Sequence, residues 1–307
     1  MTKVFIDGSA GTTGLRIYER LSERKDLDLI ILPDEFRKDN EKIKEAINES
    51  DITFLCLPDD AAREAVTFLE NDKTVIIDTS TAHRTNDDWA YGFAELKGLR
   101  EKILSSKKIA NPGCHASGFI SLVRPLVDAE ILNKDAALSC FSITGYSGGG
   151  KKMIAEYESA EKSGLLNAPR MYGISQSHKH LPEMVKITGI NNAPAFCPIV
   201  SDFYSGMEVV VSLFKEDVKE DINKIKEIYK DYYNGKIVYF NDEADEAGFL
   251  SAAKLKGKDT MEISVQGNED RILLVSRFDN LGKGASGAAI QNMNIVLGCD
   301  ETEGLNL

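Results

Sequence analysis

Short apolar runs alternate with amphipathic stretches along the first hundred residues. The amphipathic stretches, residues 13–24, 40–48 and 59–70, carry apolar residues at helical spacing, and Asp59 and Asp60 favour a helix N-terminus at the last one. The apolar runs are typical of buried strands and lie at residues 3–6, 29–32, 52–57 and 75–78. Continuous apolar strands separated by helices predict a Rossmann-like, doubly wound parallel sheet.

The pattern changes after about residue 115. Residues 218–233 carry apolar side chains at helical spacing and predict a helix, and residues 267–270 (GNED) predict the turn of a hairpin. Strands are predicted at residues 137–145, 207–214, 261–265 and 271–278. This half of the chain therefore predicts an α+β domain with a mixed or antiparallel sheet.

The C-terminal stretch, residues 284–298, reads GASGAAIQNMNIVLG and predicts a helix of small residues. Small residues permit close approach, so we expect this helix to pack back on the first domain. The predicted organisation is a first domain at residues 1–114, joined by the helix at about 283–307, and a second domain at residues 115–282.

Composition and charge narrow the classes of function. The 307 residues are 42% hydrophobic and 28% charged, which is typical of one large or two ordinary globular domains. The net charge of −12 argues against binding nucleic acid or an anionic membrane, although a local basic pocket for a small anion is compatible with it. No apolar run approaches the ~18 residues of a membrane span. The N-terminal MTKVFIDGSA predicts a first strand rather than a signal peptide.

The five cysteines are scattered and form no CxxC pair. This spacing predicts neither a metal site nor a disulfide framework. We therefore expect a reducing, cytoplasmic compartment.

A glycine-rich loop, DGSAGTTG, follows the first strand and opens the first helix. Glycines in this context let the backbone approach a pyrophosphate, which the helix N-terminus then binds. The first two glycines are spaced one residue wider than in GxGxxG, and a plain strand-to-helix turn is the alternative. The predicted dinucleotide-binding residues are Gly8, Ser9, Ala10, Gly11, Thr12, Thr13 and Gly14.

The stretch after the second strand reads LPDEFRKD. Asp34 and Glu35 stand where an acidic residue binds the adenosine ribose, but Arg37 and Lys38 follow. Two cations there favour the 2′-phosphate of NADP(H) over NAD, with a solvated charged turn as the alternative.

Residues 110–118, ANPGCHASG, place Cys114 at the start of a predicted helix. The helix is indicated by the apolar stripe of Phe119, Leu122, Val123, Leu126 and Val127. Partial positive charge at a helix N-terminus lowers the pKa of a thiol, so this context predicts a nucleophile about as strongly as it predicts a packing residue.

A cysteine nucleophile needs a proton shuttle, and the chain has four histidines. His115 is next to Cys114, and neighbours along a helix do not face each other. His83 follows a strand. His178 and His180 lie in SHKHLPEM and would line one site if that segment is extended. A surface pair or half a metal site is the alternative, but no third ligand is evident nearby.

Together the motifs GSAGTTG, DTSTAHR, NPGC, SHKHLPEM and NLGKGASGAAIQNMN resemble N-acetyl-γ-glutamyl-phosphate reductase of arginine biosynthesis. The resemblance is to the shorter branch of that family, within the aspartate-semialdehyde dehydrogenase superfamily, and runs from residue 3 to about 298. NPGC and GKGASGAAIQNMN are specific motifs. Ala10 departs from the superfamily's usual GxTGxxG loop, where a threonine stands.

The resemblance implies an activity. Cys114 would attack the γ-acyl phosphate and form a thioacyl enzyme, and NADPH would reduce it to the semialdehyde. His180, with His178 next, would be the general acid and base. The first domain would bind NADP and the second would hold the catalytic and dimerisation surfaces, so we expect a homo-oligomer, a dimer or tetramer.

The resemblance also assigns weaker roles. Lys283 and Gly284 would return to the nicotinamide side of the cofactor. Ser80 and Arg84 would bind the phosphate, with a helix cap and a surface cation as their alternative roles. The complete predicted substrate and phosphate set is Ser80, His83, Arg84, Asn111, Tyr146, Ser147 and Gly148.

Two other functions remain open from the sequence. One is a reductase of the same chemistry on another acyl phosphate, such as aspartyl phosphate (aspartate-semialdehyde dehydrogenase) or a carrier-linked aminoadipyl phosphate. The other is a dinucleotide-binding sensor without catalysis, which we expect to lack the cysteine or the histidine.

Overall fold

A computed structural model describes residues 1–307, and the chain divides into two compact units. The first unit comprises residues 1–113 and 285–305, and the second comprises residues 114–284 with the last two residues. The chain therefore passes from one unit to the other directly before Cys114 and returns directly after Gly284.

The first unit is built on a six-stranded sheet in the order β2-β1-β3-β4-β6-β5, in which every pair is parallel. The strands are β1 (Thr2–Asp7), β2 (Leu27–Ile30), β3 (Ile52–Leu55), β4 (Val75–Asp78), β5 (Ala90–Tyr91) and β6 (Lys108–Ala110). The order reverses between β1 and β3, and the carboxyl ends of strands at such a point form the ligand crevice of doubly wound folds. The predicted parallel sheet is confirmed.

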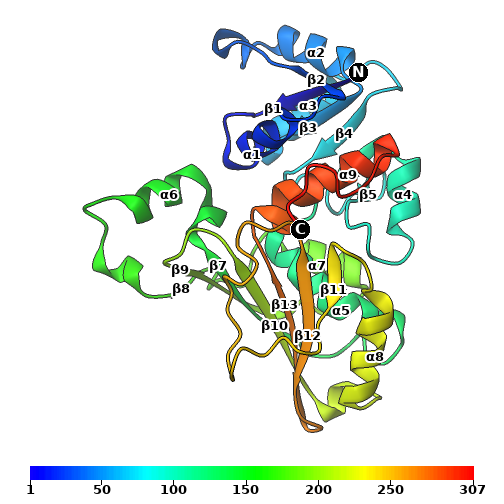
Figure 1. Cartoon of the computed structure of the whole chain (residues 1–307), viewed down its shortest axis with the longest axis vertical. Helices are drawn as coiled ribbons and strands as arrows, with labels where there is room; N and C mark the ends of the chain where they lie inside the picture. Colours follow the sequence, from blue (N-terminus) through cyan, green and yellow to red (C-terminus); the bar gives the residue numbers. More distant parts are fainter. The chain divides into compact units, whose positions relative to one another are not determined.

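Helices cover both faces of this sheet (Figure 1). On one face α1 (Thr12–Leu21), α4 (Leu99–Ser105) and α9 (Gly287–Leu297) share a core with β1, β3 and β4. On the other face α2 (Asn40–Glu49) and α3 (Asp59–Thr67) share a second core with the same strands. The four-residue strands are buried on both sides, which is why they read as continuous apolar runs.

The C-terminal helix α9 belongs to the first unit although it comes last in the chain. The amide of Asn292 donates to the carbonyl oxygen of Gly92, and a Cβ on Gly92 would lie 2.4 Å from that amide nitrogen. The guanidinium of Arg24 donates to Asn294 and to Asp26. The glycine at residue 92 thus allows α9 to pack closely on the segment that follows β5, and Arg24 binds α9 to the segment that follows α1.

The second unit is built on a seven-stranded mixed sheet in the order β11-β12-β13-β10-β7-β9-β8. The strands are β7 (Ser139–Gly145), β8 (Arg170–Met171), β9 (Ala195–Ser201), β10 (Met207–Phe214), β11 (Val238–Phe240), β12 (Met261–Gly267) and β13 (Arg271–Phe278). Two of its pairs, β7 with β9 and β11 with β12, are parallel, and the rest are antiparallel. The predicted mixed sheet is confirmed.

Helices α5 (Cys114–Asp128) and α8 (Ile222–Tyr232) pack on one face of this sheet, and α7 (Leu181–Thr188) packs on α5. On β10, Val209 and Val211 are buried while Val210 between them is half-buried, as expected for a strand with one covered face. A further helix, α6 (Gly150–Glu158), follows β7. Short 3₁₀ turns lie at Asp34–Phe36, Tyr146–Gly149, Gly164–Asn167 and Lys215–Asp217.

Four predicted helix boundaries are wrong by three residues or more. One is the end of α3, which lies at Thr67 rather than residue 70. Helix α8 begins at Ile222 rather than 218, because the carboxylate of Asp221 caps it and Val218 instead forms a β-bridge to Leu132. A π-helical turn at Gly282–Ser286 delays α9 to Gly287. Helix α1 ends at Leu21, three residues early.

Some elements were not predicted at all. They are β5, β6, α4, α6, β8, β9 and β11, and the strands among them other than β9 are two or three residues long. Such strands are too short to show a period of two.

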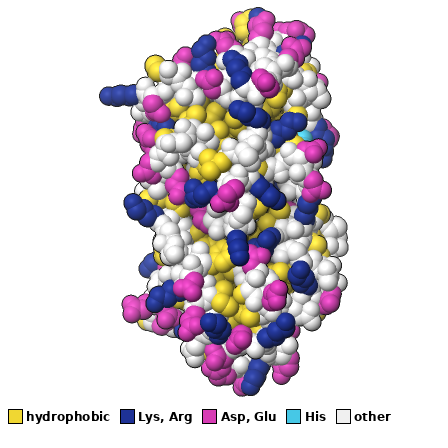
Figure 2. Space-filling view, turned by 90° about the vertical axis from the view of Figure 1, so that its right-hand side faces the viewer, with side chains coloured by type: hydrophobic (Ala, Val, Ile, Leu, Met, Phe, Trp, Pro, Cys, Tyr) yellow, Lys and Arg dark blue, Asp and Glu magenta, His cyan; other side chains and the backbone are white.

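Basic and acidic side chains are intermixed on the face shown in Figure 2, and no continuous basic area is present on that face. No helix of the chain combines the length and the apolar character that a membrane crossing requires.

Candidate active site

The glycine loop joins β1 to α1 in the first unit. Gly8 has a positive φ of 81°, and a Cβ there would lie 2.4 Å from the carbonyl oxygen of Cys56, directly after the neighbouring strand β3. A Cβ on Gly14 would lie 2.4 Å from the carbonyl oxygen of Gly8. These two glycines are therefore required by the close approach of backbone to backbone, at the point where the sheet order reverses.

Helix α1 begins at Thr12 with Gly11 as its N-cap. No side chain caps this helix, and no acidic residue lies in its first turn. Its N-terminal N–H groups and the positive end of its dipole suit an anion, so the loop fits the pyrophosphate of a dinucleotide.

The predicted cations Arg37 and Lys38 follow β2, whose strand is next to β1. Both side chains are exposed, and Arg37 forms an ion pair of 2.7 Å with Asp34. Sheet topology therefore brings the charged turn to the same edge of the first unit as the glycine loop.

Cys114 is the first residue of α5, in the second unit. It is half-buried, whereas burial raises the pKa of the Cys56 thiol to about 12 and raises that of Cys140 as well. Gly284 lies directly against it, because a Cβ on Gly284 would stand 3.0 Å from the Cβ of Cys114. Among these three thiols, Cys114 alone combines partial exposure with a helix N-terminus, the setting of a reactive thiolate.

His178 and His180 lie together, with ring centroids 4.8 Å apart. The shared-face argument required an extended segment, but the segment forms a turn. The N–H of Leu181 donates to the carbonyl of His178, and His180 has helical backbone angles as the N-cap of α7. A turn brings the two rings together. The N–H of His180 donates to Nδ1 of His178 at 3.2 Å, which places the proton of a neutral His178 on Nε2.

His115 joins this histidine cluster, which the sequence did not predict. Its ring centroid lies 5.8 Å from that of His178 and 5.7 Å from that of His180. Its Nδ1 lies 2.6 Å from Oγ of Ser142, and its Nε2 lies 2.6 Å from the hydroxyl of Tyr172. Burial, and then the charge of His178, lower the pKa of His115 to about 3, so this imidazole is neutral at ordinary pH.

Burial is the main influence on the pKa values in and around the cluster. Burial, and then the charge of Lys179, lower the pKa of His178. Burial, and then the charge of Cys114, raise the pKa of Tyr172. The Tyr172 hydroxyl therefore lies within electrostatic reach of the cysteine, which no sequence motif indicated.

At the end of β4 in the first unit, Asp78 gathers two of the predicted phosphate-site residues. Its carboxylate accepts hydrogen bonds from the N–H and the hydroxyl of Ser80, and lies 2.7 Å from Nδ1 of His83. The His83 ring stacks on Trp89 with centroids 4.0 Å apart. The carboxylate orients the imidazole so that Nε2 is the ring nitrogen left to a ligand.

Arg84 and Asn111 bond to backbone in the same unit. Nε of Arg84 donates to the carbonyl of Asn111, and Nη2 donates to the carbonyl of Thr79. The side chain of Asn111 donates to the carbonyl of Ala285 and accepts from Asn292. These contacts hold the segment that leads into Cys114. The sequence predicted both residues only as phosphate ligands and did not indicate these contacts with the backbone.

The remaining predicted residues lie in the second unit. Tyr146 stacks on Tyr157 with centroids 4.8 Å apart, and Ser147 accepts a hydrogen bond from the Asn280 amide. Gly148 has only distant neighbours, since a Cβ there would meet no atom closer than 3.5 Å. Lys283 is buried.

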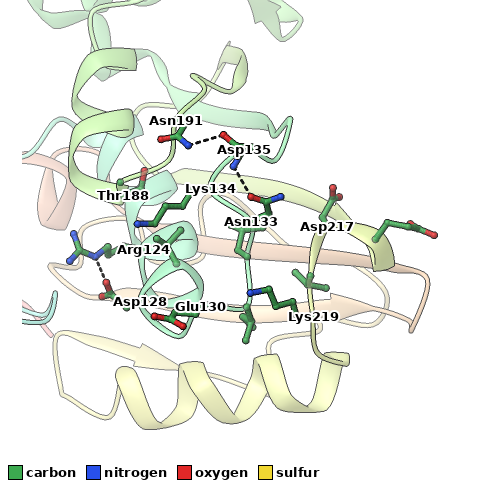
Figure 3. A pocket seen from close by; sticks show the side chains of 16 residues that line it. Arg124, Asp128, Glu130, Asn133, Lys134, Asp135, Thr188, Asn191, Asp217 and Lys219 are labelled. Atoms are coloured by element: carbon green, nitrogen blue, oxygen red, sulfur yellow. Dashed lines mark hydrogen bonds and ion pairs between the residues drawn. The ribbon is translucent and has the colours of Figure 1, made fainter.

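A hollow of about 960 Å³ lies in the second unit, around the C-terminal end of α5 (Figure 3). Arg124, on its wall, is ten residues along α5 from Cys114, or about 15 Å at 1.5 Å per residue. The lining side chains largely pair with one another: Arg124 with Asp128 at 2.6 Å, and Asn191 with Asp135 at 2.7 Å. This hollow is separate from the cysteine.

No group of three or more histidine, cysteine or acidic side chains is arranged to hold a metal ion.

Comparison with known proteins defines the class. Residues 34–106 match the family model of the semialdehyde dehydrogenase NAD binding domain, and residues 114–280 match that of the semialdehyde dehydrogenase dimerisation domain. Aspartate semialdehyde dehydrogenase II from Vibrio cholerae, complexed with ASA, has the same fold, with a TM-score of 0.71 over 97% of this chain and 98% of that one, at 16% identity. The enzyme from Francisella tularensis matches over 97% and 100% of the two chains, with the same TM-score and identity. The fold is thus that of the semialdehyde dehydrogenases, with a domain for a nicotinamide dinucleotide.

Sequence relatives narrow the class further. The N-acetyl-gamma-glutamyl-phosphate reductases of Brucella ovis and Brucella canis are each 45% identical over 306 residues, which cover 96% of this chain and 99% of theirs. The chain therefore belongs to the N-acetyl-γ-glutamyl-phosphate reductase family, a family of oxidoreductases, and the predicted family is confirmed.

Proposed function

We propose that this protein reduces N-acetyl-γ-glutamyl phosphate with NADPH, giving N-acetylglutamate 5-semialdehyde and phosphate. The observation that carries the proposal is Cys114 at the first residue of α5, in the same unit as three clustered imidazoles, in a chain that belongs to this family. In this proposal the first unit binds the dinucleotide, and the second holds the nucleophile.

The cysteine carries the covalent step. The thiolate of Cys114 attacks the acyl carbon, the carbon–sulfur bond forms, and the carbon–oxygen bond to phosphate breaks. The N-terminus of α5 stabilises the thiolate before attack, because its partial positive charge faces the sulfur. Phosphate leaves with the electron pair of the broken bond, and a thioester remains on the sulfur.

We assign the general acid and base to His180. Nδ1 of His178 already accepts the N–H of His180, so a neutral His178 presents only an N–H from its other nitrogen. It can donate a hydrogen bond but not take a proton at that atom. His180 is the neighbouring imidazole in the same cluster, 4.8 Å away between ring centroids.

The glycine loop and the first turn of α1 would hold the cofactor pyrophosphate, as the glycine geometry supports. When bound, the reduced nicotinamide supplies the hydride that converts the thioester to the aldehyde. Arg37 and Lys38 would bind the 2′-phosphate, which supports NADP(H) over NAD. For the substrate phosphate, an imidazolium at His83 would donate from Nε2 in the first unit, while Asp78 holds its Nδ1 and both donors of Ser80.

The activity is tested in the reverse direction with N-acetylglutamate semialdehyde, phosphate and NADP⁺, beside aspartate semialdehyde. We expect clear preference for the acetylated substrate. Equal or faster turnover of aspartate semialdehyde would establish the alternative substrate, and dinucleotide binding without turnover of either would establish a sensor. Cys114→Ser should remove turnover, while Cys197→Ser, at another half-buried thiol, should keep it.

The histidine assignment is tested with His180→Asn and His178→Asn. The first should lower kcat by about 10²-fold or more, in the range of general acid–base catalysis. The second should cost less, because an asparagine oxygen can still accept the backbone N–H. If His178→Asn is inactive and His180→Asn is near normal, the two roles are reversed.

Cofactor preference is tested with Arg37→Ala. We expect the Kd of NADPH to rise about tenfold, the loss of one charge-assisted hydrogen bond, with little change for NADH. An equal loss for both cofactors would show that Arg37 does not read the 2′-phosphate.

We also propose that the enzyme is a homodimer or tetramer that associates through the open face of the second sheet. Phe141, next to half-buried Val210 on the face opposite α5, is 47% exposed, and Leu273 on the same face is 39% exposed. A large exposed apolar face is typical of a protein interface. Phe141→Lys should lower the mass measured by light scattering, whereas Leu104→Lys on the first unit should not.

A further inference from the structure

Asp279 follows β13 directly and carries a fully buried carboxylate, with 0% of the residue exposed. Its Oδ1 accepts hydrogen bonds from the backbone N–H groups of Leu281 and Gly282, at 2.7 and 3.2 Å. Its Oδ2 accepts from the hydroxyl of Ser205 at 2.8 Å and from the backbone N–H of Gly257. Because a backbone N–H can only donate, both carboxylate oxygens act as acceptors here.

The main-chain carbonyl of Asp279 closes the same turn. It accepts the N–H of Gly282 at 3.1 Å and the N–H of Gly284 at 3.0 Å. The second bond spans five residues, the spacing of a π-helix, and residues Gly282–Ser286 form the π-helical turn before α9. Such turns are rare and occur frequently at functional sites. Asp279 thus holds this turn through both its side chain and its main chain.

The backbone at Gly284 is where this turn meets Cys114. A Cβ on Gly284 would stand 3.0 Å from the Cβ of Cys114 and 3.1 Å from the carbonyl oxygen of Asp279. Gly284 therefore lies against both the cysteine and the residue that holds the turn, with no side chain of its own. A shift of the turn changes the space beside the Cys114 side chain, so the bonds to Asp279 set that space.

We propose that Asp279 is a positioning residue for the reaction, because it fixes the turn whose backbone at Gly284 bounds the side chain of Cys114. The inference rests on the proposed function, since it needs Cys114 to be the nucleophile. A reacting atom that is displaced by about 1 Å can lose about 10²-fold in rate. A residue that acts only through Gly284 can therefore still determine kcat.

The test replaces Asp279 with alanine, which removes all four acceptor contacts of the carboxylate. We expect kcat in the reverse assay, at saturating substrates, to fall by about tenfold or more. The rate at which iodoacetamide alkylates Cys114 is followed by mass spectrometry between pH 5 and 10. The midpoint of this profile should not move, because the N-terminus of α5 still stabilises the thiolate and a free reagent needs no fixed sulfur.

The readout separates positioning from a merely structural role. If loss of the carboxylate disrupted the start of α5, the alkylation midpoint would rise together with the loss of kcat. Asp279→Asn should recover most of kcat, because its amide oxygen can still accept the N–H groups of Leu281 and Gly282. Ser205→Ala, which removes only a donor to Oδ2, is the matched control: it should lower the urea midpoint of unfolding and leave kcat near the wild-type value.

Circular dichroism checks that each variant is folded. If Asp279→Ala does not fold, Asp279→Ser takes its place, because a serine hydroxyl keeps one acceptor for the turn, and its kcat should lie between those of Asp279→Asn and the Gly284→Ala variant. An unchanged kcat in the folded alanine or serine variant, or a kcat loss that comes with a raised midpoint, would overturn the inference and leave the function standing. Failure of the function looks different, since Cys114→Ser would then keep its turnover.

Discussion

Asp7 ends β1 and begins the glycine loop, and replacing it with asparagine tests what a buried charge costs there. Burial raises the pKa of Asp7 from the ordinary 3.8 to about 6, although the N–H of Gly8 donates to the carboxylate and opposes the rise. Asp7→Asn keeps the side-chain size and an oxygen for that hydrogen bond while it removes the charge.

The sign of the effect follows from the direction of the shift. Because the folded state holds the proton of Asp7 more tightly than the unfolded state, it loses stability as pH rises from about 3.8 to about 6, and the cost is constant above that. A difference of about two pKa units corresponds to about 3 kcal/mol at pH 7.5 as an upper figure, and to about 1 kcal/mol at pH 4.5. Asp7 is only 6% exposed, so solvent screens it little.

We therefore expect Asp7→Asn to raise the free energy of unfolding of the first unit, by up to these amounts. The single tryptophan, Trp89, is buried in that unit, so its fluorescence in urea follows the transition. Asp28→Asn, at an exposed position of β2, is the matched control for net charge. A gain from Asp7→Asn that is the same at pH 4.5 and pH 7.5, or no gain at all, would refute the reasoning.

Two further substitutions test close packing in the second unit. Gly284→Ala would place a Cβ 3.0 Å from that of Cys114, and we expect kcat to fall about tenfold because the sulfur is displaced. An unchanged kcat would show that α5 can shift to accept the extra methyl group. Gly118→Ala would place a Cβ 2.3 Å from a methyl of Val209, and overpacking of about 1–3 kcal/mol should exceed the gain of about 1 kcal/mol in helix propensity. Adding Val209→Ala should recover at least about 1 kcal/mol in a double-mutant cycle of urea unfolding, whereas strict additivity would contradict the contact.

The pattern of the sequence predicted those elements whose burial is periodic. The buried strands β3 and β4 are continuous apolar runs, and β10 alternates because α5 covers one of its faces. The glycine loop was recognisable because only glycine permits the positive φ and the backbone approach at Gly8. Boundaries were less well predicted where a local contact, such as the cap at Asp221, overrides the apolar period.

The histidine cluster shows the limit of local reasoning. Along a helix, the neighbours Cys114 and His115 point in different directions, so nothing in the sequence indicated that His115 belongs to the site. The structure places its ring against His178 and Tyr172, which follow it by about sixty residues in the chain. Only the packing of α5 against β7 and the segment between β8 and α7 creates that contact.

The sequence by itself thus determined the two kinds of sheet, the glycine loop, the cysteine at a helix start and the family. Each of these depends on short-range order: a repeat of polarity, a glycine that a turn requires, or a motif of a few residues. The tertiary structure decided which side chains pair near Cys114: the N–H of His180 with His178, and His115 with Ser142 and Tyr172. Those pairings depend on which buried polar groups meet across the core, and they exist only once distant segments have packed together.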